Sequence, residues 1–396
     1  MSNSDQFIPF SPPFLGQEEM DEVIDTLRSD WITTGPKVKR FEADFADFLG
    51  ARAALALSSA TDALQVGLAT LGVSPGDEVI TTPMTFCSTV HAIEHLGARP
   101  VLVDVEPDTL NIDPARVAAA ITSRTKGILP VHLYGHPCEM SLLSELASRH
   151  ELFILEDAAH ALPARYQDRL IGSHEQRDIF PFPQLTAFSF YATKNMTTAE
   201  GGMLTGDLEL IEKARPWSLH GMSRDAYKRY SAEGSWFYEV VLPGYKCNMT
   251  DIQAALGIQQ LKKLPSFQRR RREIFSAYLA AFSDLAVLEL PVERPEVESA
   301  LHLFVIRLRP ELATIDRDTF INRLTERGIG TSVHFIPIHL HPYYRDKYGY
   351  APDDFPIAHR EYRRMISLPL YPRLSETEVN RVIQAVRDVA QGATRG

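Results

Sequence analysis

Cysteine and long apolar runs are scarce in this chain. Its 396 residues include three cysteines, and Cys87, Cys138 and Cys247 form neither a C-x-x-C pair nor a His/Cys cluster at zinc spacing. A disulfide framework or a structural metal is therefore not expected. No segment approaches the about 18 uninterrupted apolar residues of a membrane span, and the N-terminal MSNSDQFIPF lacks the basic and apolar regions of a signal peptide. We expect a cytoplasmic protein.

Positive charge is also scarce. The 41 Lys and Arg residues face 51 Asp and Glu residues, which gives a formal net charge of -10 at pH 7. Without a basic stripe to collect phosphate backbones, nucleic acid is not an expected partner. A few arginines and backbone N–H groups inside a cleft can still bind an anionic substrate.

The length and the 44% of hydrophobic residues are enough for two domains. Between residues 38 and 205, short apolar runs alternate with amphipathic stretches at 62–71, 86–95, 113–121 and 140–149. This alternation predicts a doubly wound α/β domain with a largely parallel sheet. Seven strands are predicted, at 53–57, 78–82, 100–103, 127–133, 152–156, 186–190 and 202–205.

The pattern changes after Asp251. Two helical runs, 252–264 and 266–282, indicate a connecting helix pair. Strands are then predicted at 303–308 and 331–335 and helices at 317–327 and 376–390, so a smaller α+β domain ends the chain. We predict a large domain at residues 1–255, including an N-terminal arm, and a small domain at 256–396.

One lysine differs from the others by its position. The strand TAFSF runs directly into YATKN and TTAEGG, so Lys194 follows the carboxyl end of a strand, where open α/β sheets bind ligands. Most lysines are solvated surface charges. A buried lysine with a lowered pKa suits Schiff-base chemistry, because only the neutral amine attacks a carbonyl.

A carboxylate and a histidine follow another strand. The run 152–155 ends in EDAAH, which brings Asp157 and His160 to the same sheet edge. Enzymes that use pyridoxal phosphate (PLP) need a carboxylate against the pyridine nitrogen, because the protonated ring is the electron sink. Asp157 fits that role, although Asp is also a common helix N-cap. His160 could contact the ring hydroxyl or orient Asp157, and the pattern leaves both open.

Hydroxyl groups and an aromatic ring complete the predicted pocket. In LALSSATDALQVGL a strand ends in a turn that opens a helix, and its free N–H groups with Ser59 and Thr61 suit a phosphate. A plain Ser/Thr-capped helix is the ordinary alternative. Ser189 offers a further hydroxyl, and Phe86 either stacks on the cofactor or is a core aromatic. These features at successive strand ends together predict a PLP site.

Five motifs carry a family resemblance: FSFYATKNMTTAEGGML, EDAAH, SSATDAL, WITTGPKVKRFE and PGYKCNMTDIQAALG. With them nearly the whole chain resembles the DegT/StrS-type nucleotide-sugar aminotransferases, which have the PLP-dependent transferase fold type I. The resemblance implies that Lys194 holds PLP as a Schiff base, that Asp157 pairs with the pyridine nitrogen and that His160 approaches the ring hydroxyl. It also implies phosphate contacts from Ala60, Thr61 and Ser189 and ring stacking by Phe86.

The resemblance further implies a homodimer with shared active sites. Asn248 corresponds to a residue that reaches the phosphate of the neighbouring subunit's cofactor, although it could equally cap a local turn or helix. Sugar-nucleotide contacts are implied at two segments, WITTG and TSVHFIPIHLHPYY. The substrate-binding candidates are Trp31, Thr33, Tyr191, His220 and His334.

One segment departs from the family pattern. Between Gly172 and Thr186, SHEQRDIFPFPQL is longer than the turn such enzymes have before the lysine strand. The insertion could cover the cleft or a subunit contact, or it could be a tolerated surface loop.

The resemblance indicates transfer of an amino group from an amino acid, glutamate, to a nucleotide-linked keto sugar, at C4 because WITTGPK and the EGG loop resemble the 4-amino branch. A 3-keto sugar or an inosose is the alternative acceptor. A PLP-dependent sugar dehydratase is disfavoured by Lys194, since such proteins carry histidine there. A non-catalytic PLP-binding regulator would need a DNA-binding or partner module, which the composition does not show.

Overall fold

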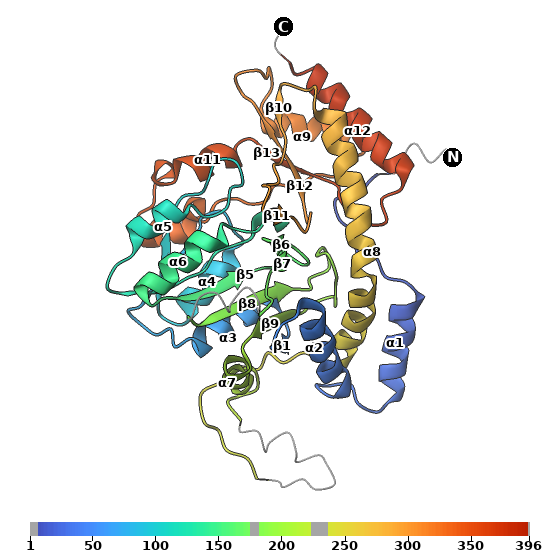
Figure 1. The fold of residues 1–396 in the computed structure, drawn as a ribbon. Helices are drawn as coiled ribbons and strands as arrows, with labels where there is room; N and C mark the ends of the chain where they lie inside the picture. Colours follow the sequence, from blue (N-terminus) through green and yellow to red (C-terminus); the bar gives the residue numbers. More distant parts are fainter. Residues whose placement is uncertain (1–6, 175–181, 223–236, 395–396) are drawn as a thin grey trace.

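The computed structural model describes residues 7–174, 182–222 and 237–394 (Figure 1). Its centre is a seven-stranded sheet with the order β1-β9-β8-β5-β4-β2-β3. β9 is antiparallel to both its neighbours, β1 and β8, and the other pairings are parallel. Each predicted strand overlaps a strand of this sheet: β1 (Ala53–Leu57), β2 (Glu78–Thr81), β3 (Arg99–Leu102), β4 (Thr125–Ile128), β5 (Phe153–Asp157), β8 (Gln184–Ser189) and β9 (Gly202–Gly206). The strand predicted at 127–133 ends earlier than expected, at Ile128.

The sheet is buried on both faces. Successive side chains of a strand point to opposite faces, so in β1 Ala54 and Ala56 join one core while Leu55 and Leu57 join another. One face packs against α2 (Pro36–Leu49), α5 (Pro114–Ala120), α6 (Met140–His150) and the first part of α8 (Asp251–Phe282). The other face packs against α3 (Ala60–Thr70), α4 (Cys87–His95) and α7 (Leu208–Ser218).

A second, antiparallel sheet lies in the C-terminal part of the chain. It has the order β10 (Leu288–Glu289), β12 (Phe304–Leu308), β13 (Met365–Leu368). With α9 (Arg317–Glu326), α12 (Glu376–Gln391) and the end of α8 it encloses a separate core. The described residues also form α1 (Gln17–Arg28), α10 (Pro342–Tyr348), α11 (Pro356–Tyr362), β6 (Arg165–Tyr166), β7 (Arg169–Leu170), β11 (Val297–Glu298) and the short 3-10 helices η2 (Leu133–Gly135), η4 (Ile338–Leu340) and η5 (Pro352–Asp354).

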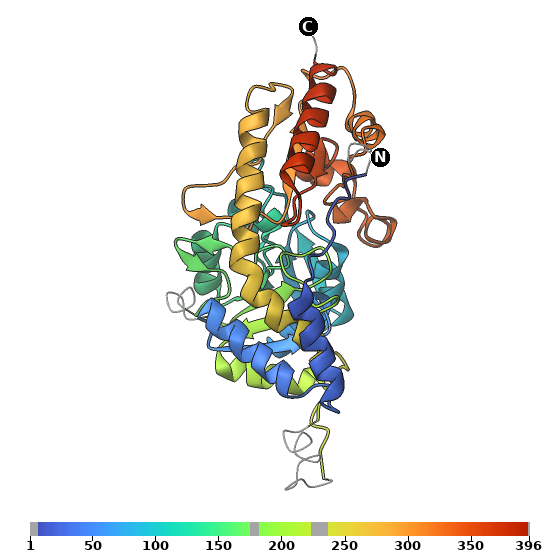
Figure 2. The same ribbon diagram turned by 90° about the vertical axis from the view of Figure 1, so that its right-hand side faces the viewer.

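The predicted helix pair after Asp251 is wrong, because α8 is one helix of 32 residues with Pro265 inside it. Proline removes one backbone hydrogen bond, but the residues on either side are held by packing. Leu264 is buried in the core of the large sheet, and Phe275 is buried in the core of the small one. Figure 2 shows α8 running from beside α1 and α2 to beside α12. The helix crosses the predicted boundary at residues 255–256, and the domain division stays a prediction.

The strand predicted at 331–335 is also wrong. Only Ser332 pairs there, through an isolated bridge to Ser367. The carbonyl of His334 accepts a hydrogen bond from the Tyr134 hydroxyl instead of joining a ladder, so the backbone leaves the sheet.

The insertion before β8 is described only at its ends. Residues 175–181 lie outside the described residues, and Phe182 packs against the core of the large sheet.

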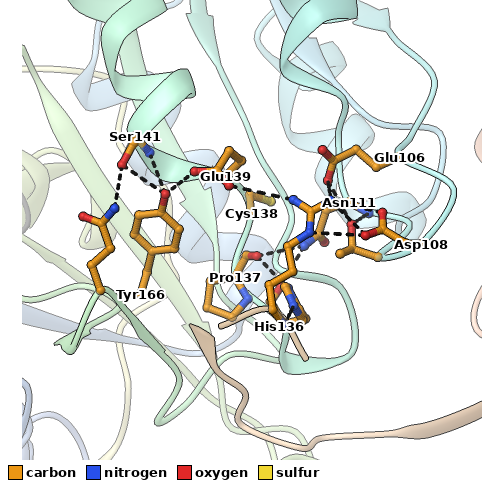
Figure 3. A network of polar contacts seen from close by, with 12 residues as sticks. Glu106, Asp108, Asn111, His136, Pro137, Cys138, Glu139, Ser141 and Tyr166 are labelled. Atoms are coloured by element: carbon orange, nitrogen blue, oxygen red, sulfur yellow. Dashed lines mark hydrogen bonds and ion pairs between the residues drawn. The ribbon is translucent and has the colours of Figure 1, made fainter. Parts of the chain in front are cut away.

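A polar network joins the loop before β11 to the large sheet (Figure 3). Arg294 forms ion pairs with Glu106 and Asp108, each at 3.0 Å, and its N–H donates to His136 Nε2 at 3.3 Å. Asn111 donates to the carbonyls of His136 and Pro137 and accepts from the N–H of Leu133. The loop at 133–138 is therefore fixed from both sides.

No helix in the described ranges is long and apolar enough to span a membrane.

Asp251 joins the start of α8 to the start of α2. Its buried carboxylate accepts hydrogen bonds from the N–H groups of Gly35 (2.8 Å), Val38 (3.0 Å) and Lys37 (3.1 Å). These donors have no partner within α2, because the first N–H groups of a helix are left free. One carboxylate therefore caps a helix that is far away in the sequence.

We expect Asp251→Ala to lower the free energy of unfolding by about 1–3 kcal/mol, because buried donors lose their acceptor. Asp251→Asn keeps one acceptor oxygen and should lose less. Urea unfolding followed by circular dichroism measures the difference. An Asp251→Ala protein as stable as the wild type would contradict this role.

Candidate active site

A cavity of about 510 Å³ lies at the carboxyl ends of the central strands. Parallel strands end at the same edge of a sheet, so residues distant in the sequence meet there. Segments from the C-terminal part and from the N-terminal arm form the opposite wall. The predicted site residues that line this cavity are Ser59, Ala60, Thr61, Phe86, Asp157, His160, Ser189, Tyr191, Lys194 and His334.

Lys194 lies in the tight loop that follows β8. Its N–H donates to the carbonyl of Tyr191 at 2.9 Å, and the Thr198 N–H returns to the carbonyl of Phe190 at 2.9 Å. Burial lowers the pKa of Lys194 to about 8, and the nearby charge of Asp157 acts in the opposite direction. A neutral nucleophilic amine is therefore available near physiological pH.

Asp157 ends β5 and is 5% exposed. Its Oδ2 accepts from the Thr89 hydroxyl at 2.8 Å and its Oδ1 from the Ala159 N–H at 3.1 Å, while Thr85 and Thr89 are joined at 2.7 Å. Burial raises the pKa of Asp157, whereas the hydrogen bonds from Thr89 and Ala159 act to lower it. The carboxylate has no ion pair with any described residue, Lys194 included. The protonated ring nitrogen of PLP would give Asp157 a cationic partner.

His160 is fixed by backbone and not by Asp157. Its Nδ1 accepts from the N–H of Tyr134 at 3.3 Å, and burial holds the pKa of His160 well below its ordinary value. A neutral imidazole that accepts at Nδ1 carries its proton at Nε2. Nε2 can therefore donate to an oxygen in the cavity. Two roles were open for His160: contact with the ring hydroxyl of PLP, or orientation of Asp157. The geometry favours the first, and that role stays a prediction.

The start of α3 provides an anion site. Ser59 is its N-cap, and the Ser59 hydroxyl accepts from the Asp62 N–H at 3.1 Å and donates to the Asp62 carboxylate at 2.7 Å. The N–H groups of Ala60 and Thr61 at the first turn have no partner within the helix. Gly202 keeps β9 close to this turn, since a Cβ there would lie 2.4 Å from the Ser59 carbonyl oxygen. The site fits the phosphate of PLP.

Four predicted residues lie outside this cavity. Trp31 donates from its ring N–H to the carbonyl of Thr34 at 3.0 Å, and the Asn248 amide donates to the Thr34 hydroxyl at 2.5 Å. The carbonyl of Thr33 accepts from the first N–H of α8. His220 is exposed after α7. Their roles in substrate or partner binding stay predictions.

Several lining residues were not predicted, among them Phe10, Ser11 and His302, while Phe335 lies in the predicted segment TSVHFIPIHLHPYY but was not singled out. Phe10 arrives with the N-terminal arm and stacks on His334 at a centroid distance of 5.3 Å. His302 precedes β12 and so lies at the amino end of a strand. The rule that ligands bind at the carboxyl ends of strands does not predict such a residue. Thr89, which bonds Asp157 from inside α4, was also missed. No local sequence pattern marks these residues, because tertiary contacts bring them to the cavity.

The comparison with known families decides the identity. The model of the DegT/DnrJ/EryC1/StrS aminotransferase family matches residues 13–387. The chain belongs to this family. The spore coat polysaccharide biosynthesis protein SpsC of Bacillus subtilis (strain 168) is 50% identical over 389 residues, which are 98% of this chain and 98% of that protein.

Solved structures agree with the family. The putative sugar aminotransferase Spr1654 from Streptococcus pneumoniae, in its PLP-form, has a TM-score of 0.89 at 36% identity and covers 98% of this chain and 99% of that chain. Helicobacter pylori PseC, an aminotransferase involved in the biosynthesis of pseudoaminic acid, has a TM-score of 0.88 at 30% identity, with 98% and 100% covered. The predicted fold, family and enzyme class, a PLP-dependent sugar aminotransferase, are confirmed.

We expect the rate at which apoprotein captures added PLP to rise with pH through about 8, because the neutral form of Lys194 increases above its pKa. Asp157→Asn should move this midpoint to lower pH, since the carboxylate raises the pKa of Lys194. Borohydride trapping followed by mass spectrometry measures the attached cofactor. Capture that does not change with pH, or a reducible linkage in Lys194→Ala, would overturn the assignment.

Thr89→Val removes the hydroxyl that bonds Asp157 while keeping the shape of the side chain. The pKa of Asp157 should rise, because that bond favours its charged form. The acidic limb of the pH profile, where activity is lost as Asp157 becomes protonated, should therefore move to higher pH. On this limb we expect a loss of activity of about 10-fold or more relative to wild type. The pH profile of the donor half-reaction measures this. Thr89→Ser should keep the wild-type profile, and a Thr89→Val profile equal to it would refute the role.

Proposed function

We propose that this protein transfers an amino group from an amino acid, glutamate, to C4 of a nucleotide-linked keto sugar. One observation carries the proposal: a single cavity joins a buried Lys194 amine, the Asp157 carboxylate and the start of α3 in a chain of the sugar aminotransferase family. The C4 position and the nucleotide rest on the resemblance of WITTGPK and the EGG loop to the 4-amino branch.

The residues present suit PLP. Lys194 Nζ would hold its aldehyde carbon, Asp157 its ring nitrogen, His160 Nε2–H its ring oxygen, and the N–H groups of Ala60 and Thr61 its phosphate. When bound, PLP supplies the electron sink that stabilises a carbanion at the amino carbon. Lys194 Nζ, once released by the amino-acid donor, would take the proton from that carbon as a base and deliver it as an acid to the carbon of PLP that carried the aldehyde, so that the nitrogen stays with the cofactor.

The exposed aromatic rings of the cavity support a large acceptor. Phe86 is 59% exposed and Tyr191 47% exposed, although both line the cavity. Bound PLP would cover Phe86, and a sugar nucleotide beside the cofactor would cover the ring of Tyr191. Tyr191 and His334 are the substrate contacts that we propose within this chain's own cavity.

A homodimer with shared active sites is part of the proposal. Lys194 is the only lysine or arginine among the described residues that line the cavity, so this wall offers few charges to a phosphate. Asn248 lies outside its own cavity. α1 exposes Met20, Ile24 and Leu27 on one side, a stripe that a second copy could cover. We propose that the dimer acts in the cytoplasm.

The acceptor can be identified directly. Protein converted with glutamate to the pyridoxamine form should regain the PLP absorption band when the correct keto sugar is added. We expect recovery with a nucleotide-linked 4-keto sugar and little with 3-keto sugars, an inosose or the same sugar without its nucleotide. A response limited to 3-keto sugars would correct the ring position. No response to any keto sugar would overturn the function and leave the fold untouched.

A further inference from the structure

Three histidines of the cavity are bonded through the same ring atom. His160 Nδ1 accepts from the Tyr134 N–H, His302 Nδ1 lies 3.0 Å from Asn195 Oδ1, and His334 Nδ1 lies 2.9 Å from the Ser367 hydroxyl. None of the three Nε2 atoms has a hydrogen bond to a described residue. Nε2 is therefore the ring atom that each histidine offers to a ligand. His302 has no role in the function proposed above.

The proton of His302 can be placed from its partner. The amide nitrogen of Asn195 donates to the carbonyls of Leu162 and Ala300, both at 2.8 Å. Two carbonyl acceptors fix the orientation of the amide, so Asn195 Oδ1 must accept from His302. His302 Nδ1 then carries the proton, and Nε2 carries a lone pair. His334 allows no such assignment, because the Ser367 hydroxyl can donate or accept.

His302 and His160 are thus opposite tautomers in contact. Their ring centroids are 4.3 Å apart, with the planes inclined by 33°. His160 offers a donor at Nε2 and His302 an acceptor. Burial holds the pKa of His302 well below its ordinary value, and the neighbouring Lys194 and Arg271 act in the same direction. The acceptor is therefore present in the working pH range.

The backbone of His302 is held from two sides. Its N–H donates to the carbonyl of Tyr134 at 3.1 Å, in the loop that the Arg294 and Asn111 network of Figure 3 fixes. From the other side, the fully buried Arg271 donates to the carbonyls of Leu301, His302 and Leu370. The position of Nε2 in the cavity is built into the fold.

The two substrates of an aminotransferase differ in what they bring to such an acceptor. A carboxylate of the amino-acid donor has only acceptor oxygens, and a neutral imidazole nitrogen with a lone pair repels it. A sugar hydroxyl is a donor. We propose, on the basis of the function proposed above, that His302 Nε2 accepts a hydrogen bond from a hydroxyl of the acceptor sugar and so favours the sugar over the amino acid. His302 is a specificity-determining residue.

A matched pair of variants tests this proposal. In His302→Gln the side-chain amide reaches the place of Nε2 and keeps an acceptor there, whereas in His302→Asn the amide reaches the place of Nδ1 and keeps only the contact with Asn195. Each half-reaction is followed by absorbance in a single turnover: the PLP form with glutamate, then the pyridoxamine form with the keto sugar. Urea unfolding checks that both variants are folded.

We expect His302→Asn to lose about 10-fold or more in the sugar half-reaction and to stay within about 3-fold of wild type with glutamate. His302→Gln should recover most of the sugar reaction. A structural role alone predicts the reverse order, because Asn keeps the bond to Asn195. Equal losses in both half-reactions, or no loss in either, would refute the proposal for His302. Wild-type protein that reacts with no keto sugar would instead refute the proposed function itself.

Discussion

The buried pair of Lys194 and Asp157 is the constraint on which the site depends. Burial penalises the charged form of each group, so it lowers the pKa of the lysine and raises that of the carboxylate. The charge of each group opposes the pKa shift of the other, but no ion pair joins them. The fold instead keeps the carboxylate in place with hydrogen bonds from Thr89 and Ala159. Asp157 therefore lines the cavity as a hydrogen-bonded carboxyl group without an ion pair to any described residue, which suits the ring nitrogen of PLP.

The cavity needs both ends of the chain. The sheet brings Lys194 and Asp157 to one edge, but the opposite wall comes from the N-terminal arm with Phe10 and from the C-terminal part with His302. Ile8 bonds the backbone at Gly328 and Gly330, which fixes the arm beside the small sheet. α8 passes between the two cores as one helix. The distance between the cavity wall that carries Lys194 and Asp157 and the wall that carries Phe10 and His302 is thus set by helix packing rather than by a flexible linker.

The sequence could predict the parts of the site that depend on local pattern. The central strands are buried on both faces, so they are visible in the sequence as apolar runs. Because open α/β sheets bind ligands at the carboxyl ends of their strands, Lys194 and Asp157 could then be predicted to lie together. Tertiary contacts decided the rest. Pro265 is tolerated because both of its flanks are packed, and the strand expected at 331–335 is lost to a bond from Tyr134. His302 enters from the amino end of β12, a position that no local rule marks.

The histidines show why neutral groups suit this cavity. A fixed cation in the place of His302 would attract the carboxylate of the amino-acid donor, whereas a sugar hydroxyl would gain little from it. In the proposed function, the direction of the hydrogen bond at His302 Nε2 would distinguish a sugar hydroxyl from a carboxylate without a further charge. His160 and His302 are in contact, are both buried, and differ in the ring atom that carries the proton. That difference is set outside the cavity, by the backbone of Tyr134 and the amide of Asn195, so the bound substrate cannot easily reverse it.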